Sequence, residues 1–198
     1  MMVKREETVV SRSDDELDAA LLESLQAPAY EDLHEDDETL WSEILPNLWQ
    51  GGTDDYDVMS MGRPVSENPF ITKVHFDTVV TLYASARPVD WFVREIRYGF
   101  WDHDMKDFNS EDLFDIVRVA HTDWKNGRRV LIRCQAGWNR SGLITALVLI
   151  REGYSARDAI DMQRKRRSEW VLCNEHFERW LLKTDANDWK GNAYGKDK

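Results

Sequence analysis

The chain has 198 residues, a formal net charge of −11 and two cysteines, which suits one domain with a sizeable core flanked by tails. Two cysteines are too few for a disulfide framework, and neither an apolar run of about 18 residues nor a signal-peptide pattern occurs, so we expect a cytoplasmic protein without a membrane span. The acidity is concentrated in residues 1–38, which hold 13 Asp/Glu and 3 Lys/Arg. The remainder is nearly neutral and lacks the basic excess typical of nucleic-acid binding.

Residues 1–38 are predicted to be an acidic, disordered segment, because they are polar and almost free of aromatic side chains. One amphipathic helix is predicted within them, since Ser13 and Glu16 have the spacing of a capping box. The residues that follow on one helical face are Leu17, Ala20, Leu21, Ser24 and Leu25. This run resembles a ubiquitin-interacting motif, and the alternatives are a helix that docks on the domain or binds another partner.

The folded domain is predicted to span residues 39–184 and to be followed by a polar tail, 185–198. Hydrophobic periodicity and turn residues predict its elements. In chain order they are a strand–turn–strand unit at 43–52, an irregular loop at 53–72 with one short helix, strands at 76–83 and 93–98, a helix capped by Ser110 and ending near 125, a strand at 130–133, and helices at 140–152, 156–165 and 175–183. Strands that alternate with helices favour an α/β sandwich with a largely parallel sheet.

The stretch 130–142, with the sequence VLIRCQAGWNRSG, carries the strongest chemical signal. An apolar run ends at Cys134, a loop with Gly137 follows, and a second apolar run begins after Gly142, which predicts a buried strand, a tight loop and a helix N-terminus. Backbone N–H groups and the helix dipole make such a loop an anion site. A thiolate at Cys134 would be a nucleophile, and Arg140 could hold a tetrahedral oxyanion with two donors.

The pattern Cys134-x5-Arg140-Ser141, with Gly137 between, resembles the phosphate-binding signature of the cysteine-dependent protein tyrosine phosphatases, and most closely their dual-specificity branch. The resemblance covers about residues 42–182. It implies a three-layer sandwich with a central, mostly parallel sheet flanked by helices. It also implies hydrolysis of phosphotyrosine, and of phosphoserine or phosphothreonine, in a protein or peptide substrate through a cysteinyl-phosphate, without a metal or other cofactor.

The resemblance assigns roles within this loop. Cys134 is the nucleophile, Arg140 holds the phosphoryl oxygens with the loop amides, and Ser141 donates a hydrogen bond to the departing thiolate. The substrate-binding positions are Gln135, Ala136, Gly137, Trp138 and Asn139. Trp138 could stack on an aryl phosphate at the rim or pack at the start of the helix. The second cysteine, Cys173, lies in an apolar context, and we expect a packing role for it.

The general acid is predicted to be an aspartate on a loop about 30 residues before the cysteine. Three aspartates compete there. Asp104 is favoured, because it lies 30 residues before Cys134 and precedes Phe108 much as the family's acid does. Asp102 is the main alternative and Asp107 the weaker one. Asn174 also matches a family position, where it could order water or cap the last helix.

Two further features leave the function open. The family usually has histidine before the cysteine, whereas this chain has Arg133, which could stabilise the thiolate or turn away from it. The basic run from Arg164 to Arg167 could face an acidic phosphopeptide or pair with the acidic segment. The loop has no lysine, which argues against inositol phosphates. The alternative functions are a catalytically weak module that binds phosphorylated residues, or a phosphatase for a phosphoinositide or an RNA 5′ end.

Overall fold

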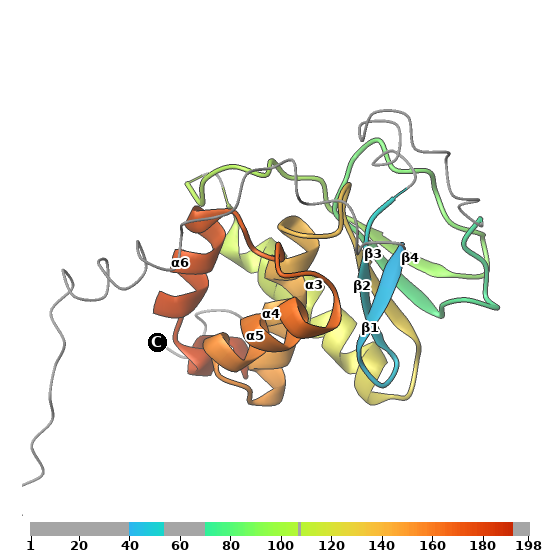
Figure 1. Ribbon diagram of the computed structural model, residues 1–198. Helices are drawn as coiled ribbons and strands as arrows, with labels where there is room; N and C mark the ends of the chain where they lie inside the picture. Colours follow the sequence, from blue (N-terminus) through green and yellow to red (C-terminus); the bar gives the residue numbers. More distant parts are fainter. Residues whose placement is uncertain (1–39, 54–69, 107, 192–198) are drawn as a thin grey trace, which may run out of the picture. The chain divides into compact units, whose positions relative to one another are not determined.

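The computed structural model describes residues 40–53, 70–106 and 108–191 (Figure 1). Three predictions lie outside the described residues. These are the amphipathic helix within 1–38, most of the irregular loop before residue 70, and Asp107.

Five strands form one sheet in the order β1-β2-β5-β3-β4. Their bounds are Trp41–Leu45 (β1), Leu48–Gly51 (β2), Thr78–Thr81 (β3), Arg94–Arg97 (β4) and Val130–Arg133 (β5). β1 is antiparallel to β2, and the other neighbours are parallel. The mostly parallel sheet predicted from the sequence is therefore confirmed.

The central strands are short and apolar because both of their faces are covered. All four residues of β3 and of β5 are buried, as parallel strands in α/β proteins usually are. β1 and β2 are joined at Asn47, whose φ of 67° is tolerated by asparagine better than by most residues.

Four α-helices and one 3₁₀ helix complete the described part of the chain. Their bounds are Ser110–Lys125 (α3), Arg140–Glu152 (α4), Ala156–Arg166 (α5), Glu175–Lys183 (α6) and Ala186–Trp189 (η2). α3 differs from the prediction at its start, since the side chain of Asn109, and not that of Ser110, accepts from the backbone N–H of Glu111. None of the helices in the described ranges has the length and apolarity needed to cross a membrane.

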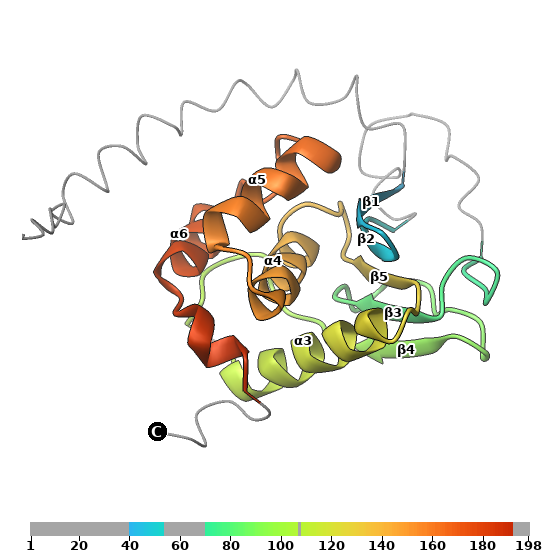
Figure 2. The same ribbon diagram turned by 90° about the horizontal axis from the view of Figure 1, so that it is seen from below.

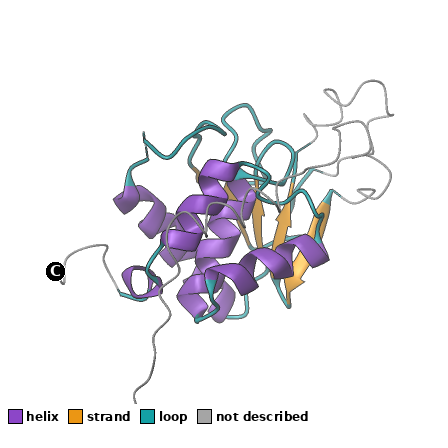
Figure 3. Ribbon diagram, turned by 60° about the vertical axis from the view of Figure 1, so that its left-hand side comes forward, coloured by secondary structure: helices purple, strands orange, loops and turns teal. Residues whose placement is uncertain are grey.

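The four α-helices lie on the same side of the sheet (Figures 2 and 3). α4 is the central helix, and its residues from Ser141 to Ile150 are all buried. It packs with Val80, Val130 and Ile132 from the helix-facing side of the strands. Burial of these side chains supplies the main hydrophobic stabilisation of the domain.

A second, smaller cluster covers the opposite face of the sheet. Val79 and Leu131 point to this side and pack with residues from the loops before β3 and β4, namely Ile71, Phe76, Val89 and Val93. In the part of the chain that the structure describes, helices therefore cover one face of the sheet and loops cover the other.

The predicted polar tail begins with a packed element. η2 follows α6, and Trp189 within it is 1% exposed. Its indole lies 6.0 Å from the rings of both Phe114 and Trp180, measured between centroids. The first residues of the stretch predicted as a tail thus belong to the core, a difference that follows from one large apolar side chain in a polar sequence.

The parallel strands bring four loops to one edge of the sheet. Gly51, Arg133, Thr81 and Arg97 stand in register at the carboxyl ends of β2, β5, β3 and β4. The segments that follow these residues therefore meet at this edge, which is where open α/β sheets bind ligands.

Candidate active site

Cys134 lies at the carboxyl end of β5 and is 2% exposed. Its Sγ accepts a hydrogen bond from the backbone N–H of Gly137 at 3.3 Å. The Ser141 hydroxyl lies 3.3 Å from the same sulfur. Two donors thus converge on the sulfur, an arrangement that stabilises a thiolate.

The signature loop, residues 134–140, turns its carbonyl groups away from the cysteine. The carbonyl oxygens of four consecutive residues, 135 to 138, accept hydrogen bonds from the surrounding scaffold. Their donors are the backbone N–H of Thr53 at 2.9 Å, the Arg167 guanidinium at 3.3–3.5 Å, the Gln50 amide at 3.0 Å and the backbone N–H of Leu172 at 3.4 Å. With its carbonyls held outward, the loop directs amide N–H groups inward, which forms an anion-binding concavity.

Gly137 is required by this loop for two reasons. Its φ is +83°, a conformation that disfavours a side chain. A Cβ there would also lie 2.4 Å from the carbonyl carbon of Gly51 and 2.5 Å from the nitrogen of Gly52. The signature loop therefore packs directly against the backbone that follows β2.

Arg140 is held in place by loops from two neighbouring strands. Its Nη1 donates to the carbonyls of Leu82 and Phe100, both at 3.3 Å. Its guanidinium also lies 5.3 Å from the centre of the Tyr83 ring. Within the described residues its buried Nε has no hydrogen-bond partner. A buried donor without a partner is costly, so this Nε is available to an anion in the loop.

Trp138 is buried, with 4% of its surface exposed. Of the two interpretations of this residue, its burial supports packing at the start of α4, and the ring is not presented at the rim for stacking.

Arg133 turns away from the thiolate and towards strands β3 and β4. Its Nε donates to the hydroxyl of Thr81 at 3.0 Å, and its Nη2 donates to Glu95 at 3.2 Å and to the Arg87 carbonyl at 2.6 Å. The side chain is 3% exposed and Glu95 is 14% exposed. The charge that replaces the family's histidine is thus neutralised below the site.

The aspartates of the acid loop occupy different places. This loop, residues 98–109, joins β4 to α3, and the structure describes all of it except residue 107. Asp102 accepts from Asn139 of the signature loop at 3.0 Å and from Asn174, the N-cap of α6, at 2.7 Å. Asn139 in turn accepts from the backbone N–H of Asn174 at 3.0 Å. Three side chains thereby join the acid loop, the signature loop and α6 in a closed ring.

Asp104 has no printed contact with this ring and is paired with a neighbour instead. The Lys106 backbone N–H donates to Asp104 at 3.1 Å, and its ammonium lies 3.1 Å away. These interactions, in that order, lower the pKa of the Asp104 carboxyl. We expected an acid that keeps its proton near neutral pH, so in this conformation the aspartate is held in its basic form.

Cys173 does not have the packing role predicted for it. The residue is exposed, and its Sγ donates to the Asn139 side chain at 3.4 Å. Desolvation raises the pKa of the Cys173 thiol, which favours this donor form. The preceding residue, Leu172, has a φ of 61°, an uncommon conformation for a branched side chain and one that clusters at functional sites.

The basic run near the end of α5 divides into two kinds of residue. Arg167 holds the signature loop and also donates to Ser42 at 3.2 Å. Arg164 donates to the carbonyl of Val171 at 3.1 Å and to Glu178 at 3.0 Å. These two arginines therefore brace the site, whereas Lys165 and Arg166 are exposed.

The sequence reasoning missed two residues that shape the loop, Gln50 and Arg167. Gln50 was treated only as part of a strand, although a fully buried glutamine must find a partner. A polar residue in a buried strand was the available signal for it. No comparable signal separated Arg167 from its basic neighbours.

Comparisons with known proteins agree with this geometry. The family model for the catalytic domain of dual specificity phosphatases matches residues 62–187. Protein 123R of Invertebrate iridescent virus 6, named as a tyrosine phosphatase, is 32% identical over 91 residues, which are 40% of this chain and 64% of the viral protein. The chain thus spans somewhat under two thirds of the length of this curated relative.

Solved structures show the same fold at low sequence identity. Human DUSP28 superposes with a TM-score of 0.57 at 18% identity, covering 73% of this chain and 92% of that one. The Orf virus tyrosine phosphatase OH1 superposes with a TM-score of 0.55 at 16% identity, covering 83% and 95%. With the family model, the fold and the signature loop in agreement, the chain belongs to the dual specificity phosphatase family.

Proposed function

We propose that this protein hydrolyses phosphomonoesters of phosphorylated proteins, phosphotyrosine first and phosphoserine or phosphothreonine as well, through a cysteinyl-phosphate. The observation that carries the proposal is the convergence on Cys134 of the Gly137 amide and the Ser141 hydroxyl, beside an Arg140 whose Nε has no hydrogen-bond partner among the described residues. A nucleophile, an oxyanion site and a hydroxyl stand in one loop, as covalent phosphoryl transfer requires.

In the first step the Cys134 thiolate attacks phosphorus while the bond from phosphorus to the leaving oxygen breaks. Arg140 and the inward amides of residues 135 to 140 hold the three equatorial oxygens, and one such preorganised donor contributes about 2.7–4 kcal/mol to the barrier in other enzymes. The leaving oxygen takes a proton from the general acid. The products are the free hydroxyl compound and a cysteinyl-phosphate.

In the second step water attacks phosphorus and the S–P bond breaks. The carboxylate that gave its proton now accepts one from this water, and inorganic phosphate leaves. The Ser141 hydroxyl, 3.3 Å from the sulfur, donates a hydrogen bond to the thiolate as it departs. The cycle consumes one water and restores the free thiolate.

We assign the general acid to Asp104 and a positioning role to Asp102. Both carboxylate oxygens of Asp102 are occupied by side-chain amides, which suits a fixed tether better than a proton donor. Asp104 lines cavities on both sides of the acid loop, so its side chain has space to reorient. In this assignment substrate binding draws Asp104 away from Lys106 and towards the leaving oxygen.

The preference for protein substrates rests on the loop and on the relatives. The signature loop from Gln135 to Asn139 holds no basic side chain that would favour a highly charged inositol phosphate. The viral relative is named for tyrosine phosphatase activity, and triple substrate specificity is ascribed to OH1 of Orf virus. A panel of phosphopeptides, phosphoinositides and RNA 5′ phosphates compares these substrate classes directly.

The test of catalysis is turnover of para-nitrophenyl phosphate in the presence of EDTA. We expect activity to persist with EDTA, because no step above uses a metal. Cys134→Ser should reduce turnover by at least about 10⁴-fold, since a hydroxyl cannot replace the thiolate nucleophile. Cys173→Ser is the matched control and should retain most of the activity. Full activity of Cys134→Ser would refute the mechanism, and tight phosphopeptide binding by an inactive wild type would indicate a binding module.

The two aspartates are separated by their pH profiles. Asp104→Asn should remove the alkaline limb of kcat and should slow esters of poorly acidic alcohols more than aryl esters, because these alcohols need protonation to leave. Asp102→Asn should keep that limb. The reverse result would transfer the acid role to Asp102.

A further inference from the structure

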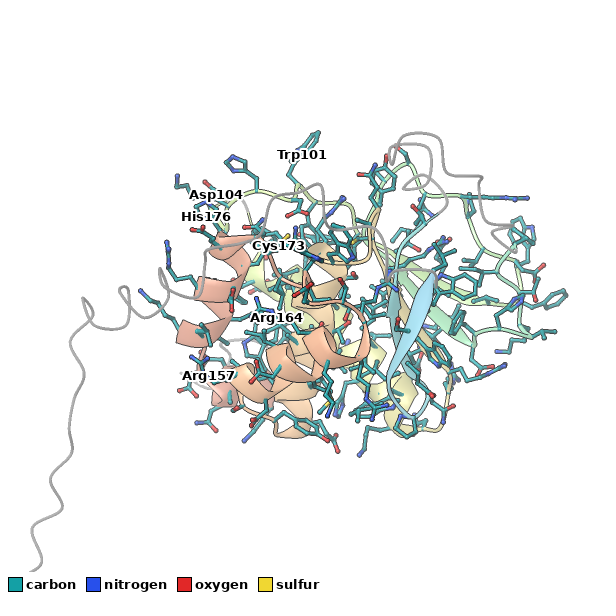
Figure 4. All side chains as sticks on the ribbon, in the orientation of Figure 1. Trp101, Asp104, Arg157, Arg164, Cys173 and His176 are labelled. Atoms are coloured by element: carbon teal, nitrogen blue, oxygen red, sulfur yellow. The ribbon has the colours of Figure 1, made fainter. Side chains whose placement is uncertain are left out.

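An open groove of about 410 Å³ lies between the acid loop and α6. Its walls come from three consecutive residues of the loop and from one face of the helix. They are Asp104, Met105 and Lys106 on the loop, and His176, Arg179, Trp180 and Lys183 on α6. The four helical positions are spaced by three or four residues, so they share one face. We call this feature the α6 groove (Figure 4).

The α6 groove is lined by an excess of positive charge. Lys106, Arg179 and Lys183 are cationic, whereas Asp104 is the one carboxylate among its lining residues. The ion pair that Arg179 makes with Glu175 is long, at 3.7 Å. The buried Nε of Arg179 has no hydrogen-bond partner within the described ranges. Converging cations with spare donors favour an anionic ligand.

The aromatic and aliphatic part of the groove is firmly held. Trp180 packs on Trp189 with ring centroids 6.0 Å apart, and the ring of His176 stacks on that of His103 at 6.3 Å. The cations of α6 therefore project from a supported helix face. A preorganised surface loses less entropy when it binds a ligand.

The α6 groove begins next to the catalytic loop. Asn174 caps α6 and contacts Asp102, which contacts Asn139 of the signature loop. Arg179 and Lys183 follow five and nine residues later, or about 7 and 13 Å along a helix that rises ~1.5 Å per residue. An extended peptide advances about 3.3 Å per residue, so about two to four residues cover that distance.

We propose that the α6 groove binds a second anionic side chain of the substrate, a phosphorylated residue or a carboxylate that lies a few positions from the target phosphate. The inference rests on the proposed phosphatase function and refines its substrate class to multiply phosphorylated or acidic segments. Because Lys106 also holds Asp104, an anion in the groove competes for this ammonium. Occupation of the groove thereby releases the carboxylate that we assign as the acid.

The experiment compares phosphotyrosine peptides that carry phosphoserine, glutamate or alanine two to four positions away, on either side. Their affinities are measured by fluorescence polarisation with full-length Cys134→Ser, and kcat/KM with the wild type. We expect the doubly phosphorylated peptide to bind about tenfold more tightly than the alanine peptide, with glutamate between them. Arg179→Gln combined with Lys183→Gln should abolish this preference and leave turnover of para-nitrophenyl phosphate unchanged.

The matched control removes the same charge from outside the groove. Arg157 and Lys165 are exposed on α5, and their double replacement by Gln should keep the preference. An equal loss in this control would show that only net charge matters and would overturn the proposal. The same holds if no peptide shows a preference, or if the groove variant loses affinity for the alanine peptide to the same extent.

Failure of the groove and failure of the phosphatase function are distinguishable. Binding is measured with the Cys134→Ser protein and needs no chemistry, whereas para-nitrophenyl phosphate tests chemistry without a peptide. A protein that hydrolyses this ester but shows no peptide preference would retain its proposed function and lose the proposed groove.

Discussion

The signature loop and the acid loop meet at the same edge of the sheet but are held in opposite ways. The signature loop is mostly buried, and its carbonyls are bonded to β2, α5 and the turn before α6. The acid loop packs at its ends through Phe100 and Phe108 on Phe177, with ring centroids 6.2 and 5.7 Å away. Between these anchors Trp101 is 87% exposed.

This difference separates two requirements of the chemistry. The oxyanion site must be preorganised, because donors that reorient during the reaction lose their catalytic advantage. The general acid must approach different leaving groups and then receive a proton from water, so it benefits from a less constrained loop. Variants in the signature loop and its support should therefore have larger effects than variants in the acid loop.

The largest effect is expected for Arg133→Ala, below the signature loop. The change removes a buried guanidinium from Glu95 and from the Thr81 hydroxyl, and breaking a buried ion pair costs about 3–5 kcal/mol. Urea denaturation should show a matching loss in the free energy of unfolding.

Arg97→Ala is the control for this charge pair. Arg97 donates to the same Glu95 oxygen at 2.8 Å but is 35% exposed, so its loss should cost about 1 kcal/mol or less. Equal costs for the two arginines would contradict the role given to burial.

Gly137→Ala should come next, with a loss of about 100-fold in kcat/KM. The added Cβ collides with the backbone at Gly51 and Gly52, and a displacement of about 1 Å is enough for such a loss. Activity on para-nitrophenyl phosphate measures it.

Gly127→Ala is the comparison for backbone strain alone. Gly127 has a φ of +78°, but nothing lies within 4 Å of a Cβ there. We expect a destabilisation of about 1 kcal/mol with normal kcat/KM. Loss of activity in both variants would mean that strain, and not the contact with β2, controls the loop.

Asp102→Ala should reduce kcat/KM by about tenfold, because it opens the ring that joins the acid loop to Asn139 and Asn174. A double-mutant cycle with Asn174→Ala measures this coupling. If Asp102 acts through the ring, the second change should add little to the first. Additive losses would contradict a shared network.

The smallest effect is expected for Lys106→Met. The ammonium of Lys106 contributes to the lowered pKa of Asp104, so its removal should raise that pKa. Activity requires the protonated acid and falls as pH rises through its pKa, and the alkaline limb of kcat should therefore move to higher pH. The backbone N–H of Lys106 remains, which limits the shift.

Salt provides the control for this last prediction. Lys106 is exposed, with 86% of its side chain accessible, and 1 M salt screens such pairs. The wild type and Lys106→Met should therefore have similar profiles at high salt. A difference that persists there would show that Lys106 acts by contact and not by charge.

Much of the fold and the identity of the signature loop could be predicted from the sequence. The alternation of apolar strands and amphipathic helices, with Asn and Gly at their ends, depends on neighbours within a few residues. The order of Cys134, Gly137, Arg140 and Ser141 is likewise local, and the loop after β5 places them around one sulfur. Trp189 was missed because its polar neighbours concealed a core residue.

Only the tertiary structure decided which side chains support the loop and how the aspartates divide. Gln50 reaches Gly137 across 87 residues of sequence, and Asn174 reaches Asp102 across 72. The direction of Arg133 depends on Glu95, 38 residues away. The sequence by itself determined the chemistry, because the reacting groups lie within one short loop. Their support required the fold, because hydrogen bonds between distant segments leave no periodic trace in the sequence.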